Sequence, residues 1–197
     1  MRKYLLTGFI LFITFSAIAQ SEPELTVGAK AGINIYSLSS DDLIEDDDTG
    51  LSYEFGIYGR IGERFFVQPE LNLVSHKTHL ITRTQPRVGE RDALTVRYLR
   101  LPVYLGYRTD YSGPLISRVR FMAGPSISYA ISVADNNLDI QRNDIHNAQF
   151  ALNGGAGFEL WVLHLDLTYH HYFTSLLNDG RSSGKGRAFS LTAGFGF

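Results

Sequence analysis

The chain of 197 residues contains no cysteine. It therefore has no disulfides, no thiolate metal ligands and no cysteine nucleophile, and it cannot be a lipoprotein, which needs a cysteine directly after its cleavage site. The chain also lacks a large excess of charge of either sign, since its formal net charge is only -2. Such a balance gives no attraction to nucleic acid, and we expect no nucleic-acid partner.

Long apolar runs are absent beyond the first 19 residues. Arg2 and Lys3 precede an apolar run, and the run ends in Ala17-Ile18-Ala19 before Gln20. This order is typical of a secretory signal peptide, so we expect residues 1–19 to be removed and residues 20–197 to form one domain. No later run approaches the roughly 20 residues that a membrane-spanning helix needs. The mature chain is then periplasmic, extracellular or a membrane-spanning β-barrel.

Alternation in the last eleven residues favours the barrel. Phe189, Leu191, Ala193, Phe195 and Phe197 share one face of an extended strand, whereas small or polar residues occupy the other face. A strand of a soluble sandwich could alternate in the same way. An aromatic last residue in that phase is typical of the closing strand of a bacterial outer-membrane barrel.

Seven earlier segments alternate with the same period of two. Together with the last segment they are 25–36, 51–60, 64–80, 94–108, 118–133, 149–160, 163–173 and 187–197. Long polar connections alternate with short ones, as they do in outer-membrane barrels. We therefore predict an all-β fold, an eight-stranded antiparallel up-and-down transmembrane β-barrel with both termini in the periplasm. A soluble lipocalin-like barrel would place its apolar residues inside instead. Prolines within three of the segments count mildly against this prediction, because proline cannot donate to a strand ladder.

Three short motifs and the ending resemble a known family. They are Pro69-Glu70-Leu71, the segment from Tyr98 to Tyr107, the segment from Gly124 to Tyr129, and Phe197. These residues resemble the PorT-like outer-membrane β-barrel family of Bacteroidota. The resemblance implies an integral outer-membrane protein in the cell envelope that is no enzyme and works as a scaffold or adaptor in an envelope or secretion assembly.

Charged residues lie on the inner faces of the predicted strands. They are Lys30, Glu54, Glu70, Arg100, Arg120, Glu159 and Asp166. An eight-stranded barrel is only wide enough for its own side chains, so we expect a structural network of ion pairs that fills the lumen. We expect the best pair to be Glu70 with Arg100. A narrow conducting path is the alternative, which would make the protein a small pore or transport barrel.

A second inward group could suggest chemistry. His164, Asp166 and His170 share one strand, and Ser190 and Thr192 lie on the next. A triad or a zinc site needs convergent geometry that in-line strand positions do not supply alone, so we expect no catalytic residues, no metal and no cofactor. A lipid-modifying barrel enzyme remains the weaker alternative. We expect three further histidines, His76, His79 and His171, to lie in loops or at the membrane interface.

The predicted outer connections differ in sign. The first is acidic, and the second is basic with Lys77, Arg83, Arg87 and Arg91. Charges in exposed segments commonly serve solubility, but the acidic connection could also bind divalent cations at a lipopolysaccharide surface. The partners expected are outer-membrane lipid, lipopolysaccharide and proteins of the envelope or of a secretion system. A soluble periplasmic binder is the remaining alternative.

Overall fold

Eight strands account for nearly all of the chain that the computed structural model describes, which is residues 24–39, 50–81, 91–110, 117–134, 148–175 and 185–197. The strands are β1 (Leu25–Ser39), β2 (Gly50–Ile61), β3 (Phe65–Ile81), β4 (Arg91–Arg108), β5 (Ser117–Val133), β6 (Ala148–Leu160), β7 (Leu163–Ser175) and β8 (Lys185–Gly196). The predicted number and order of strands are confirmed. These described ranges contain no helix with the length and apolarity that a helical membrane crossing needs.

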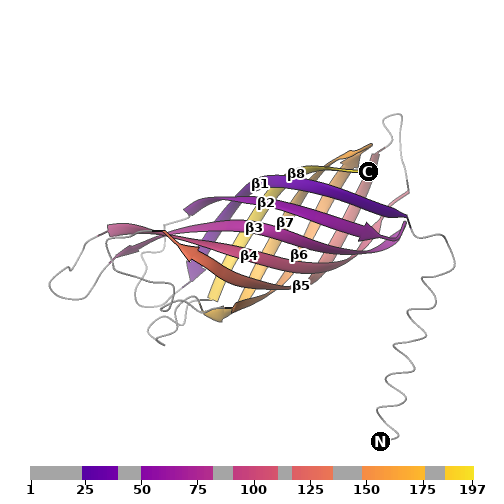
Figure 1. Cartoon of the computed structure of the whole chain (residues 1–197). Helices are drawn as coiled ribbons and strands as arrows, with labels where there is room; N and C mark the ends of the chain where they lie inside the picture. The colour runs from indigo at the N-terminus through magenta and orange to yellow at the C-terminus, as the bar shows by residue number, and fades with distance from the viewer. Residues whose placement is uncertain (1–23, 40–49, 82–90, 111–116, 135–147, 176–184) are drawn as a thin grey trace, which may run out of the picture.

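The strands close into one barrel. Each pairs antiparallel with the next, and β1 pairs with β8 (Figure 1). At the seam, Val27 and Phe197 exchange two backbone hydrogen bonds with N···O distances of 2.9 and 3.0 Å. The start of β1 and the end of β8 therefore lie at one end of the barrel, together with the short β2–β3 and β6–β7 turns. We call this end the turn end.

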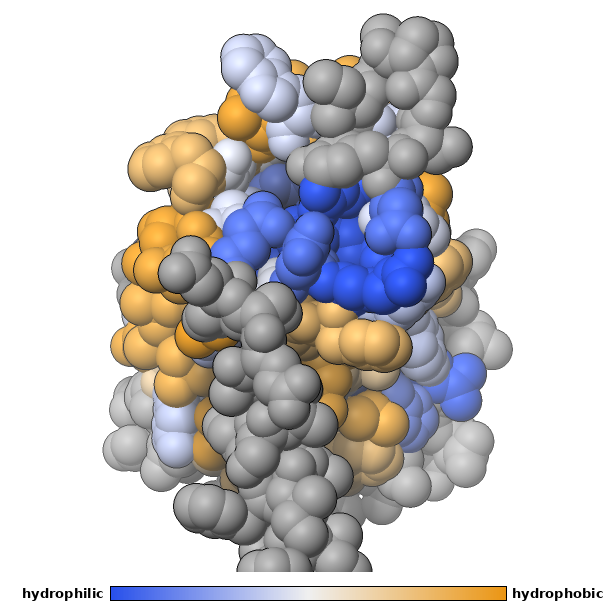
Figure 2. All heavy atoms as spheres, turned by 90° about the vertical axis from the view of Figure 1, so that its right-hand side faces the viewer, coloured by the Kyte–Doolittle hydropathy of each residue, from blue (hydrophilic) through white to orange (hydrophobic). Residues whose placement is uncertain are grey.

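Side chains alternate across the barrel wall as the sequence predicts. Outward apolar residues are well exposed, for example Phe65 and Leu105, both 65%. Their inward neighbours Phe66 and Tyr104 are 3% and 1% exposed. Seen from the turn end, hydrophilic side chains gather at the mouth of the barrel and apolar ones cover the wall around it (Figure 2). This polarity is opposite to that of a soluble lipocalin-like barrel.

Strand lengths differ from the prediction where pairing outlasts the apolar alternation. β1 continues to Ser39 because that residue still pairs with Lys185 on β8. β4 begins at Arg91, which pairs with Ile81. Backbone hydrogen bonding continues there without the apolar alternation, so the alternating pattern alone underestimates both strands.

The prolines are accommodated within the ladders. Pro69 lies opposite Val103, Pro102 opposite Ser126 and Pro125 opposite Leu152. At the turn between β2 and β3, Gly62 has a φ of 114°. A side chain at that position would be strained, so glycine is what permits this tight connection.

Candidate functional site in the barrel interior

All seven charged residues predicted to face inward are buried in the barrel. Their exposed fractions range from 0% for Arg120 to 9% for Glu159. They do not form one group around a single pair. The ion pairs divide them into two clusters at different depths, described in turn below.

The mid-barrel cluster consists of Lys30, Glu54, Glu70 and Arg100. Lys30 Nζ lies 2.6 Å from Glu70 Oε2 and 3.7 Å from Glu54 Oε1. Arg100 Nη2 lies 2.5 Å from Glu54 Oε2. The expected Glu70–Arg100 pair is therefore wrong. The register explains this, because Asn72 and not Glu70 lies opposite Arg100, and the long guanidinium reaches across to β2.

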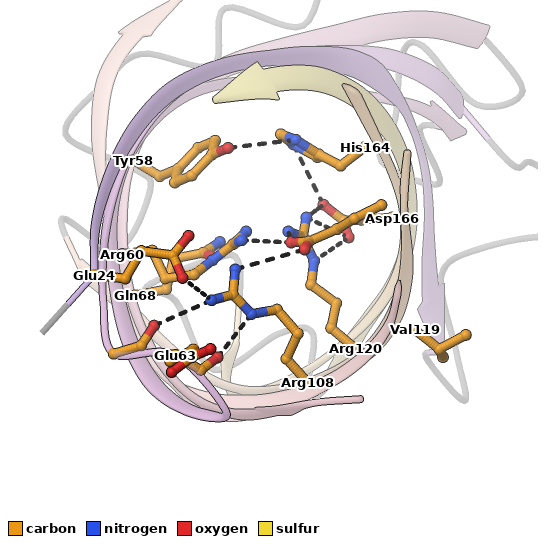
Figure 3. A network of polar contacts seen from close by, with 12 residues as sticks. Glu24, Tyr58, Arg60, Glu63, Gln68, Arg108, Val119, Arg120, His164 and Asp166 are labelled. Atoms are coloured by element: carbon orange, nitrogen blue, oxygen red, sulfur yellow. Dashed lines mark hydrogen bonds and ion pairs between the residues drawn. The ribbon is translucent and has the colours of Figure 1, made fainter. Parts of the chain in front are cut away.

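The mouth cluster lies at the turn end and is drawn in part in Figure 3. Arg120 holds Asp166 through both carboxylate oxygens, with Nε–Oδ1 and Nη2–Oδ2 distances of 3.0 and 2.6 Å. The second acid, Glu159, accepts from both Arg120 and Arg60. Arg108 completes the cluster, with Nη1 at 3.7 Å from Glu159 Oε2 and Nη2 at 2.8 Å from Glu24 Oε2.

Two members of the mouth cluster were absent from the predicted set. Arg60 and Arg108 are 2% and 3% exposed, and each occupies the last inward position of its strand. Their parity along β2 and β4 is that of the inward residues, and this signal could have identified them. A charged residue at a strand end could equally belong to a solvated turn, which makes parity less decisive there.

Gln68 joins the two clusters into one network. It accepts a hydrogen bond from Arg60 Nε at 2.7 Å and donates through Nε2 to Glu70 Oε1 at 2.7 Å. An amide carries one acceptor and one donor group, so it can contact a cation and an anion together. The interior is thus linked by polar contacts from the mouth to mid-barrel.

Replacing Gln68 with leucine tests this link. The Gln68→Leu variant leaves Arg60 Nε and Glu70 Oε1 without this partner in a buried setting, at a cost of about 1–3 kcal/mol for each such group. We expect a lower free energy of unfolding from lipid vesicles, measured by urea titration. A second variant, Gln68→Glu, can still accept a hydrogen bond from Arg60 but can no longer donate one to Glu70. It should also be destabilised, and equal stability of both variants with the unchanged protein would contradict the link.

The predicted second inward group divides in two: His170 and Ser190 contact each other, whereas Asp166 pairs with Arg120 in the mouth cluster. His170 contacts Ser190 Oγ through Nε2 at 2.9 Å and Asn153 Oδ1 through Nδ1 at 2.7 Å. Ser190 Oγ also donates to Glu54 Oε2 at 3.0 Å. This set resembles a Ser-His-Asn hydrolytic arrangement, but Ser190 and His170 are only 2% and 1% exposed. A substrate cannot reach a hydroxyl that is packed inside the lumen.

His164 belongs to a different neighbourhood. Its Nδ1 lies 3.3 Å from Tyr58 Oη and its Nε2 lies 3.7 Å from Asp166 Oδ2. Thr192, buried at 2%, also faces the interior. Over the described ranges, no group of three or more histidine or acidic residues is arranged to hold a metal ion.

The prediction that His76 lies in a loop or at the membrane interface is wrong. It is 4% exposed in the interior of β3, and its ring lies edge-on to that of Tyr98 with centroids 5.2 Å apart. Its even number continues the inward series of β3, which placed it inside. His171 faces outward on β7 and packs edge-on against Phe173, with centroids 5.2 Å apart, as a membrane-interface residue can. His79 lies in β3, and its side chain is outside the described set.

Several expectations fall outside the described residues. They are the signal peptide at 1–19, the acidic connection within 40–49, and Arg83 and Arg87 of the basic connection. Lys77 and Arg91 of that connection lie within strands β3 and β4.

Comparisons with known proteins agree with this architecture. A family model described as the outer membrane protein beta-barrel domain matches residues 7–197. The solved structure of OprG from Pseudomonas aeruginosa is similar, with 11% identity, coverage of 90% of this chain and 98% of that chain, and a TM-score of 0.50.

Two further solved barrels align over similar lengths. Ail of Yersinia pestis, in complex with the heparin analogue sucrose octasulfate, has 12% identity, coverage of 88% and 99%, and a TM-score of 0.49. Neisserial surface protein A has 13% identity, coverage of 87% and 95%, and a TM-score of 0.48. No curated protein matches the sequence. At such identities the likeness to solved structures concerns the fold alone.

Proposed function

The chain belongs to the outer membrane protein β-barrel domain family, and from this premise we propose that it is a non-enzymatic scaffold or adaptor in an envelope or secretion assembly. Its short motifs resemble those of the PorT-like barrels of Bacteroidota, and we propose this narrower placement on that resemblance. In this proposal, outer-membrane lipid and lipopolysaccharide surround the wall, and envelope or secretion proteins bind the ends of the barrel.

The observation that carries the proposal is the filled interior. Side chains from the strands meet across the lumen in ion pairs such as Arg100–Glu54 and Arg120–Asp166. Eight strands enclose little more room than their own side chains need, and an interior linked in this way supports a barrel that binds no substrate inside. We therefore propose a structural role for the seven predicted charged residues, with contacts to other molecules made at the ends and on the outer wall.

Copurification tests the adaptor role. The tagged protein is extracted from outer membranes in mild detergent, and the proteins that accompany it in stoichiometric amount are identified by mass spectrometry. We expect a reproducible envelope or secretion partner. A second tagged eight-stranded barrel from the same membrane is the control for nonspecific carriage. A lone monomer under gentle extraction would contradict the proposal.

We further propose that the turn end faces the periplasm, with both termini there. Supporting this, the short turns lie at the same end as Leu25 and Phe197, and short periplasmic turns are the rule in outer-membrane barrels. The absence of native cysteine allows single-cysteine labelling. A membrane-impermeant thiol reagent should label Asp47→Cys in intact cells and Asp110→Cys only after permeabilisation. The reverse pattern would mean the opposite orientation.

The polar continuity of the interior favours one alternative, a small pore. Contacts run from Arg108 at the mouth through Gln68 to Arg100, and a wetted path along them would conduct ions. Single-channel recording in planar bilayers decides between the roles. We expect no conductance above the lipid baseline. A defined conductance that changes with Arg120→Met would support the pore and contradict a sealed interior.

A lipid-modifying activity is the weaker alternative, motivated by the Ser190–His170–Asn153 contacts. It predicts lipid hydrolysis or acyl transfer that is lost on His170→Ala or His164→Ala. We expect no such turnover by the purified protein in mixed micelles. Turnover that His170→Ala removes would contradict the non-enzymatic proposal.

A further inference from the structure

The outer wall carries two exposed cations where its apolar band ends on β3 and β4. The outward residues of β3 are apolar from Phe65 to Leu73 and are then followed by Ser75 and Lys77. On β4 the outward residues are apolar from Tyr107 to Leu99 and are followed by Arg97. Both Lys77 and Arg97 are exposed.

Their height places them at the edge of the membrane. A strand rises about 3.3 Å per residue and is tilted by about 40° in a barrel, so the axial distance from Phe65 to Lys77 is roughly 30 Å. The apolar band of an outer-membrane barrel is about 25 Å tall. Lys77 therefore lies just beyond the hydrocarbon, on the side away from the turn end, and Arg97 lies at its boundary by the same reasoning.

The two cations are neighbours. Arg97 pairs in register with Ser75, and Lys77 pairs with Thr95, so Lys77 and Arg97 are diagonal neighbours on one face of the sheet. Such positions are about 7–8 Å apart, within reach of long side chains that converge on one group. The backbone nitrogen of Lys77 is also fixed, since it donates to Ser52 Oγ at 2.9 Å.

Acidic side chains do not offset this charge in the described part of the chain. Neither Lys77 nor Arg97 has an ion-pair partner among the described side chains. The exposed acids that the structure describes, Glu24, Glu63 and Asp110, belong to the turn end. Among the side chains that the structure describes, the exposed acids thus lie at the turn end and these two cations lie at the opposite end, facing the far leaflet.

The apolar wall is hollowed nearby, and the hollow reaches β3 and β4 at Leu73 and Leu99, on the turn-end side of the cations. The hollow extends over β8, β1, β2, β3 and β4, and its lining includes Ala29, Ala31, Leu71, Leu73, Leu99 and Ala193. Alanines at outward positions leave room where the neighbouring strands carry large side chains. Leu73 pairs with Leu99, and this pair lies two residues along each strand from the Ser75–Arg97 pair, toward the turn end. An apolar hollow next to two cations fits an amphiphile with an anionic head.

We propose that Lys77 and Arg97 bind a phosphate of lipid A and that the adjoining hollow receives one of its acyl chains. Lysine and arginine bind phosphate through charge-assisted hydrogen bonds, and basic side chains at a membrane surface attract anionic lipid. The orientation proposed above supplies the reason for choosing lipid A, because it places the cations in the outer leaflet. The site gives the barrel a bound glycolipid, which goes beyond its role as a scaffold.

Native mass spectrometry of the full-length protein in uncharged detergent tests the site. The probes are bisphosphorylated lipid A, dephosphorylated lipid A, phosphatidylglycerol and inorganic phosphate. We expect the protein to retain one molecule of phosphorylated lipid A. The double variant Lys77→Gln with Arg97→Gln should bind it about tenfold more weakly, or weaker still. Ala31→Phe, which fills the hollow, should also weaken binding. The matched control Arg64→Gln removes an exposed cation at the turn end and should bind as the unchanged protein does.

The other outcomes separate the site from its assumed orientation. Equal binding by the double variant and the unchanged protein would overturn the site, and so would displacement of lipid A by inorganic phosphate at equal concentration. Preference for phosphatidylglycerol over lipid A, abolished by the double variant, would overturn lipid A as the ligand. Thiol labelling would then show independently whether the orientation had failed.

Discussion

Replacing Arg120 with methionine should produce the largest loss of stability of any single change in the interior. Arg120 is fully buried and holds both Asp166 oxygens while it also pairs with Glu159. Removing one partner of a buried ion pair leaves an uncompensated charge and costs about 3–5 kcal/mol. Methionine retains much of the volume, so the effect reports charge and not a cavity.

Urea unfolding from lipid vesicles measures the change. The chain has one tryptophan, Trp161, which is 80% exposed at the β6–β7 turn and gives a single fluorescence probe at the membrane interface. The matched double variant, Arg120→Met with Asp166→Asn, removes both charges of the closest pair. It should recover part of the loss. A single variant as stable as the unchanged protein would show that water, and not Arg120, compensates Asp166.

Gly157→Ala should damage the same pair from the backbone side. A Cβ atom at position 157 would lie 2.0 Å from Asp166 Oδ1 and 2.8 Å from Arg120 Nε. Real Cβ contacts do not come that close, so Asp166 would have to leave its position against the guanidinium. The expected loss in free energy of unfolding is about 3 kcal/mol, the lower range for a broken buried pair.

Gly154→Ala is the matched control on the same strand. Nothing lies within 4 Å of a Cβ built at that position. Alanine there should change stability by less than about 0.5 kcal/mol, as surface substitutions usually do. Losses of equal size in both variants would mean that glycine serves the curvature of β6 and not the ion pair.

Which face each residue takes could be predicted from the sequence because strand geometry has a period of two. Lys30, Glu70 and Asp166 were placed inside by parity alone, and their burial agrees. The same parity also places Arg60, Arg108 and His76 inside, although the predicted charge network omitted the two arginines and the prediction for His76 was a loop or the membrane interface. The apolar face needs no partner information, because hydrocarbon surrounds the barrel on every side.

Which charges meet could not be predicted in the same way. Arg100 selects Glu54 from β2 although Glu70 lies on the adjacent strand. That choice depends on register and on how far a guanidinium reaches across the lumen, and neither is encoded in alternation. The role of Gln68 as a bridge has the same origin, since an inward glutamine has no distinctive pattern until its neighbours are placed.

The seam between β1 and β8 has a consequence for how the protein is made. Inside the wall, Asn34 Nδ2 donates to Ser190 Oγ at 3.1 Å across this seam, a contact between residues 156 positions apart. No ring can close until the last strand has been synthesised and delivered. Before that moment the chain has two unpaired strand edges, the form in which β-proteins aggregate. Shielding these edges until insertion therefore lowers the risk of aggregation on the way to the membrane.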